Sequence, residues 1–491
     1  MPIAEATVLV IYGICLAFIF CYSMVQLHLT VLYWLHREKW EKPYIIADPQ
    51  QAWPSVTVQL PIYNERYVVE RLLEAVAAFD YPPERLQVQV LDDSTDDTTA
   101  IIEEKLKAWP HLNLQHIRRP ERTGYKAGAL QHALPLATGE FICIFDADFV
   151  PAPDFLKRTI PAFTAPDIGV VQTRWGHLNR NYSLLTRLQA FGLNAHFTVE
   201  QSGRSSGGHF INFNGTAGIW RKACIEDAGG WQADTLTEDL DLSYRAQLRG
   251  WEFVYLEEVE APAELPADMA ALKSQQFRWT KGAAETARKH LWRVLRSKAS
   301  FLTKIHAFFH LLNSAIFLCV LLTAVLSVPM LNIRHSAPAL APVFKLGYAL
   351  LLSLGALIAF YWSAQHARSE TAWRTSLRFL PEFFLFLSIS MGLSLHNSLA
   401  VLEGYMGRKT PFIRTPKYNL IAPGDPWRKR GYRLRSISLV TVFEGLLALY
   451  FIYAIVLAFR WQLYGQLPFH LLLAFGFGAV FLYSLFHSRR G

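Results

Sequence analysis

The sequence predicts a multi-pass membrane protein in which an α/β domain is inserted between transmembrane helices. Hydrophobic residues make up 52% of the 491-residue chain, more than the about 45–50% of an ordinary soluble domain. They gather in one block at the N-terminus and in several blocks after residue 305. Between these blocks, residues 54–300 alternate short β-like runs with helical stretches, which is typical of a parallel α/β sheet.

The first apolar stretch, residues 4–35, is too long for the core of a signal peptide and lacks a clear small-residue cleavage site. The basic residues Arg37, Lys39 and Lys42 follow it. Under the positive-inside rule they place the next domain in the cytoplasm. We therefore expect residues 1–35 to form a transmembrane anchor whose N-terminus lies outside. The short N-terminus and C-terminal tail favour a bacterial inner membrane over the Golgi.

The C-terminal region, residues 301–491, contains further apolar blocks. They lie near 306–330, 343–363, 381–402, 437–459 and 468–486. Basic linkers flank the third block on both sides, at 364–379 and 405–436. Two consecutive linkers cannot both be cytoplasmic if the block between them crosses the membrane once, so we expect residues 381–402 to lie along the membrane interface. This leaves five membrane spans, the N-terminal anchor included.

The chain is basic, with a net charge of +8 and a pI near 9.1. Its Lys and Arg residues cluster beside the apolar segments, as in the run Arg428, Lys429 and Arg430, which suits membrane lipids and phosphate-bearing substrates. No basic stripe is interleaved with aromatic residues, so we expect no nucleic-acid partner. The five cysteines are scattered, without the spacing of a zinc site or a disulfide framework.

Three predicted strands end in polar or acidic loops. They are VTVQL before Pro61–Glu65, LQVQVLDDS, and EFICIFDADF. Ligands of parallel α/β sheets bind at the carboxyl ends of the strands. Asp92 and Asp93 could there accept hydrogen bonds from a nucleobase or ribose, or they could cap a turn. Asp146 and Asp148, at i and i+2, could both reach one Mg²⁺ or Mn²⁺ ion, or they could form a solvated turn.

Two further groups of polar residues follow in the same domain. Thr237–Asp239 precedes a predicted helix and either caps it or supplies Asp239 as the general base that deprotonates an acceptor hydroxyl. Gln275, Arg278 and Trp279 stand at i, i+3 and i+4 and so project from one helix face. Arg suits a departing pyrophosphate and Trp a sugar ring, although both residue types are also common lipid anchors.

In their order along the chain, these groups resemble the cellulose synthase-like branch of family 2 glycosyltransferases. The D, DxD, TED and QxxRW elements of that family match Asp93, Asp146/Asp148, Thr237–Asp239 and Gln275/Arg278/Trp279. Similar stretches also occur at 61–65, 125–128, 172–175 and 213–216. The resemblance covers residues 54–420. It implies a GT-A fold, a nucleotide-sugar donor, a divalent cation (Mg²⁺ or Mn²⁺) and a β-linkage formed with inversion.

The resemblance also implies roles for individual residues. Those that would bind the nucleotide sugar are Tyr63, Glu65, Asp92, Asp93, Lys126, Asp146, Thr415 and Lys417. Asp146 and Asp148 would bind the metal. The catalytic residues would be Asp148, Asp239, Gln275, Arg278 and Trp279. Among them Asp239 would be the base, Arg278 would serve the diphosphate and Trp279 the acceptor.

Residues 405–420 resemble the gating loop that closes over the nucleotide in processive members of the family. Thr415 and Lys417 fit the pattern, whereas Arg414 stands where a small apolar residue is usual. Arg-Thr-Pro-Lys is also found in the mannan and xyloglucan-backbone synthases of plants. A basic loop lying on lipid headgroups is the alternative interpretation.

These observations lead to one main hypothesis and two alternatives. The main one is an inverting, processive hexosyltransferase that moves glucose from UDP-glucose, or mannose from GDP-mannose, to a glycan acceptor, forming a β-1,4-glycan. The first alternative transfers a single sugar to a lipid. The second is a non-catalytic membrane scaffold or transporter, which would have lost at least one catalytic carboxylate; all are present. The sequence identifies no partner subunit.

Overall fold

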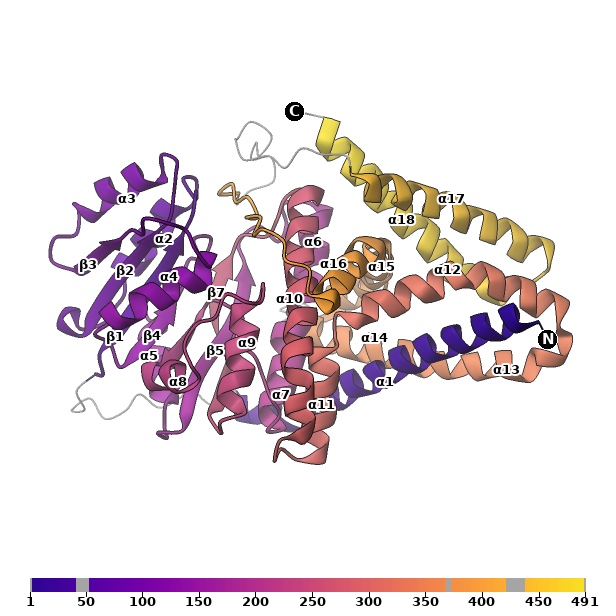
Figure 1. Ribbon diagram of the computed structural model, residues 1–491, viewed down its shortest axis with the longest axis horizontal. Coiled ribbons are helices and arrows are strands. Elements are labelled where there is room, and N and C mark those ends of the chain that lie inside the picture. Colours follow the sequence, from indigo (N-terminus) through magenta and orange to yellow (C-terminus); the bar gives the residue numbers. More distant parts are fainter. Residues whose placement is uncertain (1, 41–52, 368–371, 421–437, 490–491) are drawn as a thin grey trace.

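The computed structural model describes residues 2–40, 53–367, 372–420 and 438–489. An α/β domain lies at one end of the molecule and a bundle of long helices at the other (Figure 1). The predicted α/β domain between membrane helices is therefore confirmed. The basic run that begins at Arg428 lies outside the described residues.

The domain is built on a seven-stranded sheet with the order β3-β2-β1-β4-β6-β5-β7. Its strands are β1 (Val56–Ile62), β2 (Leu86–Asp92), β3 (Asn113–Ile117), β4 (Phe141–Ile144), β5 (Ile168–His177), β6 (Gly218–Arg221) and β7 (Glu252–Ala263). The expected all-parallel sheet is wrong in one respect, because β6 runs antiparallel to both β4 and β5. The chain enters β6 at Gly218 beside Ile144, the last residue of β4, and so has to run in the opposite direction. The loop before β6 consequently lies at the carboxyl end of β4.

Helices cover both faces of the sheet. They are α2 (Val69–Ala77), α3 (Thr98–Leu106), α4 (Tyr125–Ala133), α5 (Phe155–Thr159), α8 (Lys222–Asp227) and α9 (Glu238–Gln247). Successive strand residues point to opposite faces. In β4, Phe141 and Cys143 join the core with α2, whereas Ile142 and Ile144 join the core with α4. Because both faces are apolar, the open edge at the strand ends is left for polar chemistry.

A second group of helices connects the sheet to the membrane region. They are α6 (Leu184–Ala195), a π-helix (His196–Glu200), α7 (Gln201–Ser206), α10 (Met269–Arg296) and α11 (Phe301–Leu311). Helix α10 is 28 residues long, and its N-cap is Asp268, whose side chain accepts a hydrogen bond from the backbone N–H of Ala271. It runs between the α/β domain and the helix bundle (Figure 1). Residues on α10 can therefore reach both.

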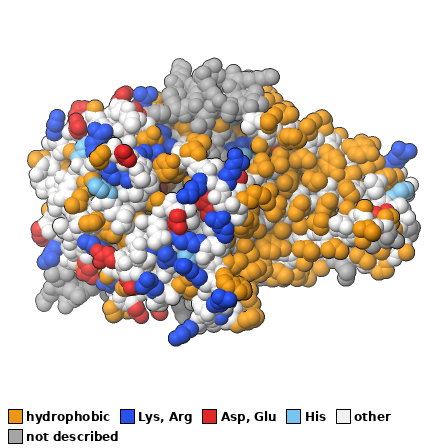
Figure 2. All heavy atoms as spheres, viewed as in Figure 1, with side chains coloured by type: hydrophobic (Ala, Val, Ile, Leu, Met, Phe, Trp, Pro, Cys, Tyr) orange, Lys and Arg blue, Asp and Glu red, His pale blue; other side chains and the backbone are white. Residues whose placement is uncertain are grey.

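The remaining helices form the apolar bundle. They are α1 (Ile3–Trp40), α12 (Ala315–Ser336), α13 (Ala341–Lys345), α14 (Leu350–His366), α15 (Ala372–Gly392), α16 (Ser394–Met406), α17 (Leu439–Arg460) and α18 (Leu467–Arg489). Hydrophobic side chains cover this half in Figure 2, whereas charged side chains are scattered over the α/β domain. Helix α1 packs beside α12 and α14 (Figure 1).

Among the described residues, five helices are long and apolar enough to cross a membrane. They are Ile3–Arg37, Ala315–Ser336, Pro342–His366, Leu439–Arg460 and Tyr464–His487. Helices α15 and α16 together would make a sixth, but they meet at an angle of 50°. An interfacial position for residues 381–402, which lie in this bent pair, stays a prediction. The block expected near 306–330 is divided, because α11 ends at Leu311 and α12 begins at Ala315.

A buried ion pair joins three of the bundle-facing helices. Lys273 of α10 donates to Glu444 of α17 at 2.7 Å and to Ser484 of α18 at 2.9 Å. The Glu444 side chain is fully buried and that of Lys273 is nearly so. Each charge therefore depends on the other for compensation in an apolar environment.

Candidate active site

A single pocket collects nearly all the residues singled out in the sequence. It lies at the carboxyl ends of β1, β2 and β4 and is closed by the start of α9, by α10 and by the loop after α16. The predicted residues that line it are Tyr63, Glu65, Asp93, Lys126, Asp146, Asp148, Asp239, Gln275, Arg278, Trp279, Thr415 and Lys417. Asp92 does not line it. Residues more than 300 positions apart thus meet at the sheet edge where the strand pattern predicted a site.

Asp92 and Asp93 point to different surroundings. The Asp93 carboxylate lines the pocket and accepts two hydrogen bonds from Arg119, from Nε at 3.0 Å and from a terminal nitrogen at 2.5 Å. Asp92 is buried behind it. Its carboxylate accepts hydrogen bonds from Ser94 N (2.8 Å), Thr99 Oγ1 (2.7 Å) and His116 Nε2 (3.1 Å). Burial alone would raise the pKa of Asp92, but these hydrogen bonds lower it to about 2.

Asp146 and Asp148 follow β4 and are each paired with a lysine. Lys126 donates to Asp146 Oδ1 at 2.5 Å and to the carbonyl oxygen of Gly215 at 2.8 Å. Lys417 donates to Asp148 Oδ2 at 2.6 Å. Two carboxylates from one strand exit that face the same pocket are a donor set of hard oxygens, which fits Mg²⁺ or Mn²⁺.

Asp239 lies in the first turn of α9, where it borders the pocket beside Glu238. Its Oδ1 accepts a hydrogen bond from Leu240 N at 2.8 Å. Burial, followed by the charge of Glu238, raises the pKa of Asp239 to about 7, against the opposing effect of Lys126. The Asp239 carboxyl group is therefore partly protonated and partly ionised near neutral pH.

The start of α9 is held close to α10 by a glycine. A Cβ atom at Gly282 would lie 2.5 Å from the Thr237 side chain and 2.8 Å from its backbone nitrogen. Only the bare backbone of α10 leaves room for Thr237, whose hydroxyl is 3.2 Å from that of Thr286. This close approach fixes the distance between Asp239 and the pocket residues of α10.

Gln275, Arg278 and Trp279 all face the pocket from α10. Arg278 donates to Thr415 Oγ1 at 2.8 Å, and its guanidinium lies 4.6 Å from the centre of the Phe412 ring. Burial lowers the pKa of Arg278 to about 10, so it stays protonated at neutral pH. The Trp279 ring lies 6.4 Å from that of Trp175 on β5, which gives the pocket an aromatic wall.

The loop after α16 lies across the pocket mouth. Phe412, Arg414, Thr415 and Lys417 all line the pocket. Glu264, directly after β7, holds the loop by accepting hydrogen bonds from the backbone nitrogens of Tyr418 (2.7 Å) and Leu420 (3.3 Å).

Arg414, the residue outside the expected pattern, has partners in this pocket. It pairs with Glu65 at 3.3 Å and donates to the Tyr63 carbonyl at 3.2 Å. Burial raises the pKa of Glu65 to about 8, although Arg414 opposes this shift.

The sequence analysis did not identify two of the residues that line the pocket, Arg122 and Glu264. Arg122 lies 3.4 Å above the centre of the Tyr63 ring and is also near Tyr125 and Phe412. Glu264 anchors the loop, and it pairs with Arg71 at 3.0 Å. Glu264 follows the end of β7 as Asp93 follows β2, so the rule of acids at strand ends would have found it had β7 been recognised. No comparable pattern identifies Arg122.

Residues 54–282 match the family described as Glycosyltransferase like family 2. The chain is 37% identical over 393 residues to glucomannan 4-beta-mannosyltransferase 1 of Oryza sativa subsp. japonica, an alignment that covers 75% of this chain and 71% of the relative. It is 43% identical over 288 residues to glucomannan 4-beta-mannosyltransferase 2 of Arabidopsis thaliana, covering 56% of this chain and 54% of that one.

Among solved structures, the mannosyltransferase PcManGT from Pyrobaculum calidifontis, in complex with GDP-Man and Mn²⁺, has the same fold. The TM-score is 0.52 at 23% sequence identity, and the match covers 73% of this chain and 100% of that chain. The predicted resemblance and the GT-A fold are thereby confirmed. The chain belongs to the cellulose synthase-like branch of glycosyltransferase family 2 and is a hexosyltransferase.

Proposed function

We propose that the protein is an inverting, processive glycosyltransferase that transfers mannose from GDP-mannose to the end of a β-1,4-linked glycan. The observation that carries this proposal is the meeting of Asp93, Asp148, Asp239 and Arg278 in one pocket. The names of its plant relatives support mannose as the sugar, and UDP-glucose is the second candidate donor.

The nucleotide would bind where β1 and β2 end. Asp93, held by Arg119, lines the pocket and can accept a hydrogen bond from a base or ribose there, whereas Asp92 is buried behind it and does not line the pocket. The stacked side chains of Tyr63 and Arg122 form a flat surface on the same side of the pocket, suited to a planar base. We therefore assign nucleotide contacts to Tyr63, Asp93 and Arg122.

A divalent cation would be held by Asp148 with Asp146 close by. When bound, it neutralises the charge of the donor diphosphate. Lys126 keeps Asp146 in place through its bond to Oδ1, and Lys417 now makes the contact with Asp148 that such a cation would need. The two lysines also supply positive charge for a diphosphate at this spot.

Asp239 would act as the general base. Inversion at the anomeric carbon requires one carboxylate that takes the proton from the acceptor hydroxyl, and no second nucleophilic carboxylate. The raised pKa of Asp239 makes it a stronger base than an exposed aspartate, which would be ionised but weakly basic. Its position in the first turn of α9, fixed against α10 by Gly282, supports this role.

Arg278 would stabilise the leaving diphosphate. Negative charge grows on the diphosphate as the glycosidic bond to it breaks, and a buried guanidinium stabilises that charge most strongly in the transition state. Thr415 already aligns Arg278 from the loop side. The loop, which lies across the pocket mouth, would thus complete the site around the donor.

The acceptor would bind against the aromatic wall of Trp279 and Trp175. Sugar rings present apolar C–H faces that pack on aromatic rings, and Gln275 can hydrogen-bond their hydroxyls. Trp279 lies on α10, which also packs against α16 and α18 of the bundle, so we assign the growing chain a path from this wall toward the bundle. The catalytic domain would face the cytoplasm, as the basic residues after the N-terminal apolar stretch predict. A bacterial inner membrane, as opposed to the Golgi, stays a prediction.

The test is donor-dependent synthesis by the purified full-length protein. Incubation with GDP-mannose, UDP-glucose or UDP-N-acetylglucosamine, followed by linkage analysis, is expected to give a β-1,4-mannan from GDP-mannose. A polymer made only from UDP-glucose would refute the donor, and a chloroform-soluble glycolipid would refute the polymer.

Two aspartate variants check the assigned base. Asp239→Asn is expected to abolish synthesis. Asp80→Asn, a change of the same kind at an exposed residue that pairs with Lys157 outside the pocket, is the matched control and should keep full activity. Unimpaired synthesis by Asp239→Asn would show that another group is the base.

A further inference from the structure

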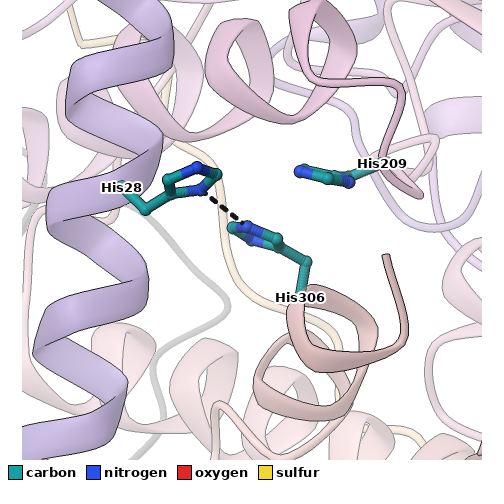
Figure 3. A group of neighbouring side chains, drawn as sticks. All are labelled: His28, His209 and His306. Atoms are coloured by element: carbon teal, nitrogen blue, oxygen red, sulfur yellow. Dashed lines mark hydrogen bonds between the residues drawn. The ribbon is translucent and has the colours of Figure 1, made fainter. Parts of the chain in front are cut away.

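Three histidines from distant parts of the chain meet where the N-terminal membrane helix touches the catalytic domain. His28 lies on α1, His209 follows α7, and His306 lies on α11. One ring nitrogen from each lies within 4.8 Å of the others. Figure 3 shows the rings of His28 and His306 pointing toward each other, with that of His209 beside them.

We propose that His28, His209 and His306 form a binding site for a borderline transition-metal ion of the Zn²⁺ type, which fastens α1 to the catalytic domain. The site is separate from the sugar-transfer pocket, none of whose lining residues it shares. Imidazole nitrogens are preferred ligands of Zn²⁺, Co²⁺, Ni²⁺ and Cu²⁺.

The distance between one pair of ring nitrogens is close to the distance between two nitrogen ligands of a bound metal ion. His28 Nδ1 and His306 Nε2 are 2.9 Å apart, so one of them carries a shared proton. In a tetrahedral zinc site with bonds of about 2.0–2.1 Å, ligand nitrogens are about 3.3 Å apart. The rings of His209 and His306 are stacked, with centres 4.0 Å apart. To admit the ion, His28 and His306 would lose that proton and open by about 0.4 Å, and the His209 ring would turn its nitrogen toward them.

His209 has the hydrogen-bonding pattern of a metal ligand. Its Nδ1 lies 3.1 Å from Thr303 Oγ1, whereas its buried Nε2 has no hydrogen-bond partner among the described residues. If Nδ1 carries the proton and donates it to Thr303, Nε2 presents an unused lone pair. In the other tautomer Nε2 would carry a buried N–H group without an acceptor, which costs free energy. Metal-binding histidines commonly fix their tautomer through such a bond on the second nitrogen.

The surroundings keep the site neutral and rigid. Arg204 of α7 lies beside the site, where it donates to the backbone carbonyl oxygen of His306 at 3.3 Å. Arg204 is itself paired with Glu200 at 2.9 Å, which offsets its repulsion of a cation. Close packing holds the elements together, because a Cβ atom at Gly203 of α7 would lie 2.5 Å from the Leu29 carbonyl oxygen of α1.

Cobalt binding to the tag-free, full-length protein in detergent tests the proposal. After treatment with a chelator, and in excess Mg²⁺ to fill the carboxylate site of the pocket, titration with Co²⁺ is expected to saturate at about one further ion per chain, with visible absorption bands that Zn²⁺ displaces. His209→Ala and His306→Ala should each weaken Co²⁺ binding more than about tenfold, since even loss of a ligand's outer partner costs about 10–100-fold. His132→Ala, at an exposed histidine on α4, is the control and should bind normally.

A ligand exchange separates coordination from packing. His209→Cys should keep Co²⁺ and add a sulfur-to-cobalt charge-transfer band, whereas His209→Ser, of nearly the same size, should lose the ion. Thr303→Val, which removes only the positioning hydroxyl, should weaken binding about 10–100-fold. No saturable Co²⁺ binding, or binding that the His209 and His306 variants leave unchanged, would overturn the site and leave the histidines as a hydrogen-bonded stack.

Discussion

The raised pKa of Asp239 predicts an unusual pH dependence of sugar transfer. The base must be ionised to accept a proton, so kcat/KM should fall on the acid side of about pH 7, where an ordinary aspartate would still be fully active. At pH 6 about one tenth of Asp239 would be ionised, which gives a rate about tenfold below the plateau. Release of nucleoside diphosphate, measured from about pH 5 to pH 9, provides the profile.

Glu238 supplies the perturbation that isolates the cause. After burial, its negative charge is the strongest influence that raises the pKa of Asp239. Glu238→Gln removes that charge while keeping the shape, so the acid limb should move to lower pH and activity at pH 6 should rise relative to the plateau. Each unit of movement corresponds to about 1.4 kcal/mol.

The matched control is Glu140→Gln, at a half-exposed glutamate outside the pocket that pairs with Arg221. Its profile should coincide with that of the unaltered protein. An acid limb below about pH 5 in the unaltered protein, or a limb that Glu238→Gln leaves in place, would refute the assignment of Asp239 and the electrostatic reasoning behind it.

Three further predictions concern the leaving group, the metal and the membrane region. Arg278→Ala should lower kcat by about 10²–10³-fold, the scale for losing one buried donor to developing charge, and Arg278→Lys should recover part of it; an unchanged kcat would refute the role. Chelation should abolish transfer, and Mn²⁺ or Mg²⁺ should restore it in an activity assay; activity in excess chelator would contradict the metal site. Lys273→Met should destabilise the protein by about 3–5 kcal/mol in detergent unfolding experiments, and adding Glu444→Leu should recover much of the loss, because an unpaired buried charge costs more than none.

The sequence predicted which residues meet in the pocket because strand ends and helix faces obey simple geometry. Acids after β2 and β4 had to meet at one sheet edge, and three α10 residues spaced at i, i+3 and i+4 had to share a face. The sequence could not tell which of two adjacent acidic residues faces the pocket. Asp92 and Asp93 look equivalent in the sequence, but side chains alternate along a strand, and Asp92 turns toward His116 and Thr99.

Other features depended on contacts that no local pattern encodes. The antiparallel β6 is only four residues long, and its direction follows from where the preceding loop enters the sheet. The break between α11 and α12 falls at Leu312–Ser314, without proline or glycine to mark it. Glu264 and Arg414 act on partners 150 to 350 positions away, at distances that only the folded chain brings together.

The contact between Lys417 and Asp148 has a consequence for how the enzyme's affinities should be interpreted. The lysine ammonium holds the carboxylate oxygen that an incoming cation would claim, so the ion and its nucleotide have to compete with a part of the protein itself. The association constant measured for the donor is then the intrinsic constant multiplied by the fraction of molecules in which Lys417 is not bound to Asp148. Because the lysine is tethered, its effective concentration stays constant, so it weakens the apparent affinity for the donor by the same factor at every donor concentration.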